Sequence, residues 1–362
     1  MALRPNELAR HSKPRYQQSP AGPEREAELP VLWVLTGPKA GDNAQVLRAA
    51  ATSGLEFVVR NIVIRPDRVT AKPTIRAGLD QLDFSASAPL VPPWPDVVLA
   101  IGRHLSRVAL WIKQQSGGKT RIALLNAPKG RWNDFDLVVL PPWYRNRDRH
   151  NVLPIAVPLI GIDPARLAAA RRQFGPELTT LPHPLHVLLV GGDMGQRKLE
   201  PGFVRHVMDQ MTKGVAAGGT IYAATSRRTP PDVVTELETG LRPQDRLYNW
   251  GAAGVENPYL GLLALGDSFT VTADSLSMLI EVARTNKPLT IAEPPPPGGL
   301  GGLVQQVSDL LRPRDLGAAI ALLYRGDHAV PLGMEPHVPA SPLPDDAELV
   351  GQRLRQLAGI KS

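Results

Sequence analysis

Short apolar runs rich in Val, Ile and Leu alternate along the chain with segments whose apolar residues recur at helical spacing. This alternation is typical of parallel strands that are buried on both faces and joined by crossover helices. The predicted strands fall into two sets, 31–35, 57–64, 97–101, 121–125 and 136–140, then 186–190, 220–224, 246–249, 268–272 and 288–292. Helices are expected at 43–53, 103–115, 201–217, 230–239, 275–285 and 302–311.

Two sets of similar length predict an α/β protein with two tandem Rossmann-like domains, whose parallel sheets face each other across a cleft. We expect one domain over 30–165 and another over 166–330, joined through a basic, Pro-containing stretch at 141–184. Residues 1–29 lack periodicity and predict a disordered tail. A helix is expected near 315–324. Residues 331–362 follow it and contain a Pro-rich stretch and then a final amphipathic segment at 345–358. The sequence leaves open whether that last helix returns to the first domain.

Composition narrows the class of protein. With 362 residues, 43% of them hydrophobic, the chain is long enough for two cores at roughly 150 residues per domain and is neither disordered nor fibrous in bulk. The absence of Cys excludes disulfides, thiolate metal sites and a Cys nucleophile. No apolar run reaches the roughly 18 residues of a membrane-spanning helix, and the first twenty residues lack the apolar stretch of a signal peptide. A soluble cytoplasmic protein is the resulting expectation.

Positive charge is unevenly distributed. The chain has 41 Lys and Arg against 34 Asp and Glu, a net charge of +7, and the segment 97–133 contains no acid. Such a segment attracts phosphate, nucleic acid or an anionic membrane leaflet, although a solvated helix face with loops is an equally good interpretation. Its seven cations are Arg103, Arg107, Lys113, Lys119, Arg121, Lys129 and Arg131.

The loop after the first strand carries candidate acceptor chemistry. Ligands of open parallel sheets bind beyond the carboxyl ends of the strands, where helix N-termini present free N–H groups. Glycines in the segment 36–45 allow a tight turn, and Asp42 or Asn43 is suited to cap the next helix. Asp42 is alternatively a general base, because a carboxylate in a cleft is partly desolvated. The candidate acceptor-binding residues are Gly41, Asn43, Gln45 and Arg103.

Three loops of the second strand set carry candidate donor chemistry. Gly191 and Gly192 directly follow a strand, with Arg197 close by, and suit the approach of a diphosphate. The stretch 225–230, Thr-Ser-Arg-Arg-Thr-Pro, is an anion clamp at a helix start or an ordinary helix cap with surface arginines. Asp274 or Ser275 is expected to cap a helix in which Glu281, about two turns in, is placed to accept the hydroxyls of a ribose.

A further pair of carboxylates has the spacing of a metal ligand set. Asp134 and Asp136 are separated by one residue, and an Asp-x-Asp pair at a strand end holds a divalent cation in some nucleotide-binding proteins. Two Asp at this spacing also arise easily by chance before a strand. We therefore expect no metal.

Four blocks in order carry a family resemblance. They are G-x-x-x-G-D-N-x-Q at 37–45, T-S-R-R-T-P at 225–230, E-N-P-Y at 256–259 and T-A-D-S-x-S-M-x-x-E at 272–281. Together, over about residues 30–325, the chain resembles the mitochondrial-fission ELM family. Many bacterial members of that family are labelled as nucleoside-diphosphate-sugar epimerases or glycosyltransferases.

That family is similar in turn to the GT-B glycosyltransferases, whose second domain binds a nucleotide sugar. The segment 275–288 resembles the helix of the peptidoglycan N-acetylglucosaminyltransferase in which a Glu contacts the donor ribose. This resemblance implies that Glu281 is the ribose ligand. It also implies phosphate or donor contacts for Ser275, Ser277, Thr225, Ser226, Arg227, Asp274 and Asn257. Other family members carry His at the position of Asp42, which leaves Asp42 and His104 as alternative catalytic bases.

The leading hypothesis is a metal-independent glycosyltransferase without a cofactor, with a nucleotide-diphosphate sugar as its donor. The acceptor would be an anionic glycolipid such as a lipopolysaccharide core, met at the cytoplasmic face of the inner membrane, and no nucleic acid partner is expected. The alternative is a non-enzymatic scaffold at a membrane surface. A nucleotide-sugar epimerase of the NAD type is disfavoured, because no Tyr is followed by Lys four residues later.

Overall fold

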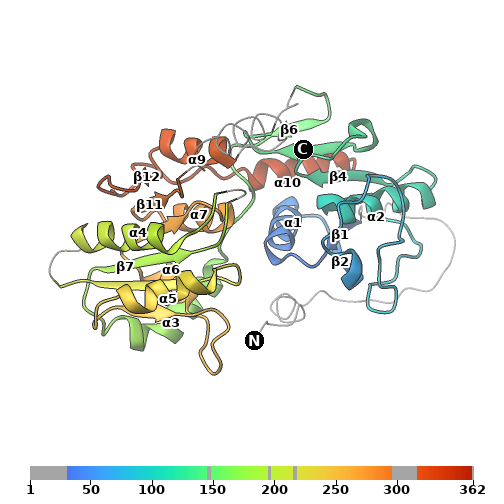
Figure 1. Ribbon diagram of the computed structural model, residues 1–362. Coiled ribbons are helices and arrows are strands. Elements are labelled where there is room, and N and C mark those ends of the chain that lie inside the picture. Colours follow the sequence, from blue (N-terminus) through green and yellow to red (C-terminus); the bar gives the residue numbers. More distant parts are fainter. Residues whose placement is uncertain (1–30, 145–147, 195–196, 215–217, 296–315, 361–362) are drawn as a thin grey trace, which may run out of the picture.

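The protein consists of two lobes, each built on a six-stranded sheet (Figure 1). The computed structural model describes residues 31–144, 148–194, 197–214, 218–295 and 316–360. Neighbouring strands in both sheets pair in parallel, as expected for two Rossmann-like units in tandem. The tail expected at 1–29 and the helix expected at 302–311 lie outside the described residues.

The first sheet has the strand order β2-β1-β3-β4-β5-β6. Because β1 lies between β2 and β3, the chain reverses its direction of winding there, and the carboxyl ends of β1 and β3 form the crevice at which such sheets bind ligands. The strands are β1 Leu32–Thr36, β2 Phe57–Asn61, β3 Val97–Ile101, β4 Arg121–Leu125, β5 Leu137–Leu140 and β6 Val152–Pro154, and the covering helices are α1 Ala40–Ser53 and α2 Gly102–Gln115.

The second sheet has the strand order β12-β11-β10-β7-β8-β9, with the reversal between β7 and β10. Its strands are β7 Leu185–Val190, β8 Thr220–Thr225, β9 Arg246–Tyr248, β10 Ser268–Thr272, β11 Leu289–Ala292 and β12 Val330–Pro331. The helices of this lobe are α3 Pro164–Leu178, α4 Pro201–Gly214, α5 Pro231–Gly240, α6 Tyr259–Leu265, α7 Leu276–Ala283 and α9 Leu316–Arg325.

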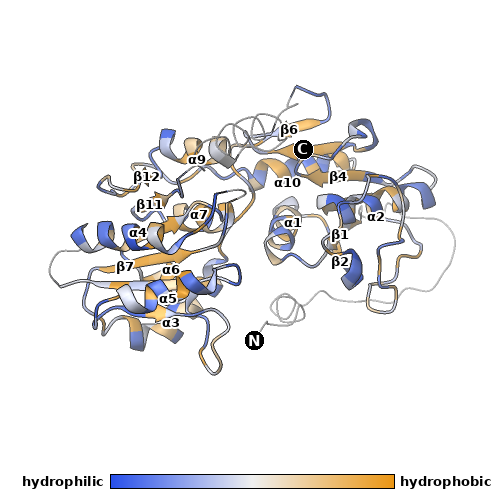
Figure 2. Ribbon diagram, in the orientation of Figure 1, coloured by the Kyte–Doolittle hydropathy of each residue, from blue (hydrophilic) through white to orange (hydrophobic). Residues whose placement is uncertain are grey.

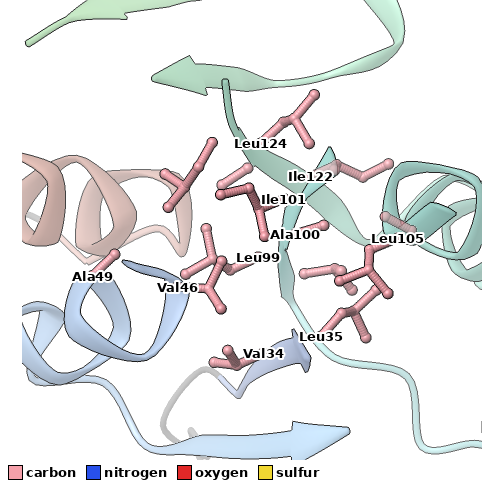
Figure 3. Close-up of a cluster of buried hydrophobic side chains, with 14 of the residues drawn as sticks. Val34, Leu35, Val46, Ala49, Leu99, Ala100, Ile101, Leu105, Ile122 and Leu124 are labelled. Carbon is pink, nitrogen blue, oxygen red and sulfur yellow. The ribbon is translucent and has the colours of Figure 1, made fainter. Parts of the chain in front are cut away.

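Burial of the central strands explains why they read as continuous apolar runs. Every residue of β1 and β3 is buried, and Leu35, Leu99 and Leu105 pack between the first sheet and its helices (Figure 3). In Figure 2 most of the strands are orange, whereas β2 ends in blue and the helices alternate between blue and orange, which is the pattern of sheets whose central strands are buried. The edge strand β2 is different, because Phe57 and Val59 are exposed.

The stretch 141–184 is more than the connection that the sequence suggested. It contains β6, which extends the first sheet, and α3, which packs on α6 of the second lobe. The side chain of Asp163 caps α3 by accepting a hydrogen bond from the N–H of Ala165 at 2.9 Å. Pro164 occupies the first helical turn, where it costs no hydrogen bond. The domain boundary expected between residues 165 and 166 falls in this first turn and stays a prediction.

The last helix returns to the first lobe. Helix α10, Ala347–Leu357, packs against α1 and buries Val350 and Leu354 in the core of the first sheet. The Thr52 hydroxyl donates to the carbonyl of Ala347 at 2.8 Å. The chain therefore crosses between the lobes twice.

The two segments that connect the lobes, around Ile160 and Asp345, meet in one cluster of charged and polar groups. Arg48 of α1 pairs with Asp345, which precedes α10, and Arg284 at the end of α7 lies 3.7 Å from the same carboxylate. Both guanidinium groups also donate to the backbone carbonyl of Ile160 in the first crossing segment. Arg48, Ile160, Arg284 and Asp345 thus join α1 to α7 and are called the junction cluster below.

We expect that Gly351→Ala destabilises the protein, because a β-carbon at this position would collide with the backbone carbonyl of Thr52 in α1. Forcing an extra methyl into such a contact costs about 1–3 kcal/mol. The measurement is the free energy of unfolding in urea. The matched control is Gly202→Ala in α4, where nothing lies within 4 Å of the new β-carbon and the change should be neutral or slightly stabilising. Equal effects of the two substitutions would contradict the close packing of α10 on α1.

Candidate functional site

The starts of α1 and α7 face each other across the two lobes. A β-carbon built on Gly41 in the first turn of α1 would lie 3.7 Å from Oγ of Ser277 in the first turn of α7. Each helix follows a strand at the reversal point of its own sheet. Two helix N-termini, with their free N–H groups and partial positive charge, therefore point into one region.

Glu281 lies one helical turn beyond Ser277 on the same face of α7, because residues four apart in a helix are neighbours. Its carboxylate is half-buried and accepts a hydrogen bond from the hydroxyl of Tyr259, which begins α6. Burial raises the pKa of Glu281, while the Tyr259 hydrogen bond and the charge of Arg166 lower it. The hydrogen bond from Tyr259 therefore fixes the orientation of the Glu281 carboxylate, which lies on the same face of α7 as Ser277.

The hydroxyls of Ser275 and Ser277 make no hydrogen bond to the part of the chain that the structure describes. Ser277 is exposed and Ser275 is half-buried. Ser275 was expected, together with Asp274, as a possible cap of α7, and this prediction was wrong: Ser275 occupies the cap position without a side-chain capping bond. Both hydroxyls lie at a helix start, where they are placed to bind an anion.

Asp274 holds together the loops at the reversal point of the second sheet. Its carboxylate accepts from the N–H of Gly192 at 2.9 Å and from the Thr272 hydroxyl at 2.8 Å, and it pairs with Arg228 at 2.6 Å. Burial raises its pKa, and these three partners oppose that shift. Asp274 does not cap α7, since its oxygens are committed to neighbouring loops.

The glycines at 191 and 192 have a packing reason. A β-carbon at Gly191 would collide with the Asp274 carboxylate, and one at Gly192 would lie 2.6 Å from the backbone carbonyl of Arg228. The space next to this turn is thus occupied by the protein's own side chain. A diphosphate contact at Gly191 and Gly192 stays a prediction.

The Thr-Ser-Arg-Arg-Thr-Pro loop after β8 uses its hydroxyls internally. The Thr225 hydroxyl accepts from the N–H of Trp250 at 2.8 Å, and the Ser226 hydroxyl accepts from the N–H of Arg228 at 3.2 Å. Thr229 donates to the carbonyl of Gly191 at 2.7 Å, which fixes the loop beside the turn after β7. Arg227 is exposed and makes no hydrogen bond or ion pair with the described residues, so its guanidinium is available to an anion.

Two other expected donor residues also have partners in their own chain. Arg197 donates to the carbonyl of Pro294 at 3.2 Å and lies 3.8 Å from Glu293. The side-chain oxygen of Asn257 accepts from the N–H of Tyr259, the first residue of α6, at 3.0 Å. Donor contacts by these two side chains stay predictions.

In the first lobe the glycine turn after β1 is closed by Asn43. Its amide accepts from the N–H of Gly37 at 2.8 Å and donates to the carbonyl of Gly37 at 2.7 Å. The expected capping of α1 by Asn43 or Asp42 was wrong, because Lys39 holds the cap position and has no side-chain capping bond. Gln45 is buried and donates to the carbonyl of Gly41 at 3.3 Å.

Asp42 lies in the first turn of α1 and faces the start of α2. A carboxylate oxygen of Asp42 is 3.9 Å from the position of a β-carbon on Gly102. The half-buried Asp42 therefore lies where the carboxyl ends of β1 and β3 meet. This is the position at which a general base is expected in such a sheet.

His104 follows in the first turn of α2. Burial and the positive charges of Arg107 and Lys39 lower its pKa, against the opposing effect of the Ala71 and Val69 backbone. The lowered pKa favours the neutral imidazole, which is the form that accepts a proton. His104 lines a pocket formed with the segment between β2 and β3, whereas Asp42 lies at the start of α1.

The acid-free segment 97–133 loses much of its apparent charge in the fold. Arg107 pairs with Asp80, Lys113 with Asp136 at 2.7 Å, and Arg131 with Asp134. The two Asp of the Asp-x-Asp pair are thus engaged by cations. Within the described ranges there is no group of three or more His, Cys, Asp or Glu with the geometry of a metal site.

Sequence reasoning missed two side chains of this site. Tyr259 was noted only as part of a motif, and its contact with Glu281 spans 22 residues that include β10. Arg228 was grouped with Arg227, although only Arg228 pairs with Asp274. Neither contact leaves a local signal in the sequence, because both depend on which strands lie next to each other.

Comparison with known proteins adds several likenesses. Over 220 residues the chain is 27% identical to the mitochondrial fission protein ELM1 of Arabidopsis thaliana, covering 54% of this chain and 51% of that protein. Over 234 residues it is 21% identical to the uncharacterized protein RP120 of Rickettsia prowazekii, covering 56% of this chain and 65% of that protein. The match therefore spans about half to two thirds of the length of these relatives.

Solved structures with similar folds include the E. coli ADP-heptose lps heptosyltransferase II. It has a TM-score of 0.44 and 12% identity, and the match covers 73% of this chain and 84% of that one. A UDP-GlcNAc 2-epimerase from Neisseria meningitidis, bound to UDP-GlcNAc, has a TM-score of 0.44 and 11% identity, with coverage of 82% and 99%.

None of the described helices is both long and apolar enough to cross a membrane. The family model described as Mitochondrial fission ELM1 matches residues 13–317, which include the four motif blocks and nearly all of both sheets. The chain belongs to the mitochondrial fission ELM1 family.

Proposed function

We propose that the protein is a metal-independent glycosyltransferase that moves a sugar from a nucleotide diphosphate to an anionic acceptor of the cell envelope, such as a lipopolysaccharide core. The observation that carries the proposal is the approach of the α1 and α7 starts, with Gly41 opposite Ser277 and Glu281 on the same face of α7. This arrangement supplies an anion site and a hydroxyl-binding carboxylate within one helix.

The donor would lie along α7. Its diphosphate would meet the N–H groups at the helix start together with the hydroxyls of Ser275 and Ser277. The exposed Arg227 adds a guanidinium suited to a phosphate. The ribose hydroxyls would donate to Glu281, which Tyr259 already orients. Positive groups at the departing diphosphate stabilise the charge that develops as the sugar leaves.

The acceptor would lie in the first lobe, at the start of α1. Its hydroxyl oxygen attacks the anomeric carbon of the sugar, the bond from that carbon to the diphosphate oxygen breaks, and the nucleoside diphosphate departs. Asp42 or His104 takes the proton of the hydroxyl. The unpaired cations of the first lobe favour an anionic acceptor, and they also suit contact with an anionic membrane surface, which we place at the cytoplasmic face of the inner membrane.

A non-enzymatic membrane scaffold is the competing function, in line with the name of the plant relative. It requires no nucleotide sugar. Binding of a partner or of liposomes would then be insensitive to changes at Glu281 and Arg227, whereas donor binding by a transferase depends on both.

We expect that Glu281→Gln and Arg227→Ala each weaken binding of the preferred nucleotide sugar by about ten-fold or more, because each removes a charge-assisted hydrogen bond. A screen of nucleotide sugars by thermal stabilisation identifies the ligand, and calorimetric titration measures the loss. Glu238→Gln and Arg325→Ala are the matched controls, since both side chains are exposed on other helices of the second lobe. If no nucleoside diphosphate or nucleotide sugar raises the melting temperature, the transferase proposal fails.

The pH dependence of donor binding should move with Tyr259. A ribose hydroxyl needs Glu281 as a carboxylate, so binding is lost as the pH falls through the pKa of Glu281. The Tyr259 hydrogen bond lowers that pKa. Tyr259→Phe should therefore raise the pKa of Glu281 and move the loss of donor binding to higher pH. At pH values well above the pKa of Glu281, the variant should still bind the donor. Titrations of both proteins from acid to neutral pH measure this, and an unchanged acid limb would contradict the role of Glu281.

A further inference from the structure

A separate pocket lies in the first lobe, between the start of α2 and the segment that joins β2 to β3. It has a volume of about 460 Å³. Arg68, Lys72, Arg76 and Arg107 line it, against a single acid, Asp80. Asp80 is paired with Arg107, whose guanidinium holds the pKa of that carboxyl below its usual range. The rim therefore keeps an excess of positive charge.

The interior of this pocket contains buried polar atoms without partners. Gln81 is 2% exposed, and its side-chain oxygen accepts no hydrogen bond. Both ring nitrogens of His104 are also buried, and neither has a partner at hydrogen-bond geometry, although the Ala71 and Val69 backbone lies near. Buried polar groups in proteins are nearly always paired, so the free oxygen of Gln81, beside ring nitrogens of His104 that only the Ala71 and Val69 backbone approaches, indicates a further partner in this pocket.

Lys72 lines the pocket, and two cations outside its lining, Arg103 and Lys129, lie near Lys72. The pKa of Lys129, whose side chain stays exposed, is lowered by partial desolvation and then by the charges of Arg103 and Lys72. Lys72, Arg103 and Lys129 form no ion pair with a described residue. Like charges at close range repel, and an anion bound between them would remove that cost.

We propose that this pocket binds the phosphate group of a phosphorylated sugar, with the cations around Lys72 on the phosphate and Gln81 and His104 on the sugar hydroxyls. A neutral imidazole offers one donor and one acceptor, and an amide offers both, which matches hydroxyl groups better than it matches a bare anion. The proposal rests on the proposed function, with the phosphosugar as a part of the acceptor that lies beyond the start of α1, and binding of the phosphosugar can be measured without any donor.

The test is a calorimetric titration of the full chain at fixed ionic strength with glucose 6-phosphate, inorganic phosphate and glucose. Glucose 6-phosphate should bind at least about ten-fold more tightly than either of the others. Lys72→Glu should weaken its binding by about ten-fold or more, through loss of one charge-assisted contact and addition of a repulsive charge. Lys119→Glu carries the same change of charge at an exposed position outside the pocket and should alter binding less than about two-fold.

Two further measurements distinguish this pocket from the donor site and from a lipid surface. Glu281→Gln should leave glucose 6-phosphate binding unchanged, so failure of the donor site and failure of this pocket are distinguishable. The resonances of the His104 ring, assigned with His104→Gln, should shift on titration. The proposal is overturned if phosphate binds as tightly as the phosphosugar, if Lys119→Glu weakens binding as much as Lys72→Glu, or if only vesicles of phosphatidylglycerol bind.

Discussion

The junction cluster is the constraint on which the candidate site depends. Arg284 is 11% exposed, and burial lowers its pKa, so its charge needs the partners that it has in Asp345 and in the carbonyls of Ile160 and Pro344. Arg48 reaches Asp345 and the Ile160 carbonyl from α1, and Gly161 has no side chain because a β-carbon there would lie 2.7 Å from the Arg48 guanidinium. Since α1 and α7 are tied through one set of groups, their opposite ends are brought to face each other. The site between the two helix starts thus depends on the junction cluster, which holds α1 and α7 together.

The turn after β7 contains two glycines but differs from a glycine-rich turn that binds phosphate, because the Asp274 carboxylate lies against it. This carboxylate already occupies the space beside Gly191, accepts the N–H of Gly192 and neutralises Arg228. An internal anion at the reversal point orders three loops, which costs little because each partner satisfies a lone pair of the carboxylate. On the proposed function, the groups that would meet a diphosphate are then the start of α7 and Arg227. This division explains why adjacent arginines in one loop have different partners, since Arg228 serves the fold and Arg227 stays exposed.

The fold was largely predictable because fully buried parallel strands leave long apolar runs, and every predicted strand corresponds to a strand of the structure. Helix α3 was missed because it is rich in Arg and Ala, contains Pro176 and buries only Ala170 and Leu178. The strands β6 and β12 are three and two residues long, too short for a periodic signal. For the candidate site, the sequence predicted which loops carry its residues but not which side chains contact each other. The contact of Tyr259 with Glu281 follows from the packing of α6 and α7 in space, which no local pattern encodes.

The distribution of charge in the first lobe is the reason why the proposed function assigns the acceptor to that lobe. The sequence shows seven cations without an acid, but the fold pairs Lys113 and Arg131 with acids that directly follow the segment, and Arg107 with an acid from the β2–β3 segment. The other four cations, Arg103, Lys119, Arg121 and Lys129, form no ion pair with a described residue, and two of them, Arg103 and Lys129, lie near Lys72. An excess of positive charge confined to one end of a sheet raises the local concentration of anions and speeds their association, and salt weakens both effects. On the proposed function, the acceptor would approach from the first lobe and the donor from the second, and the two would meet where α1 faces α7.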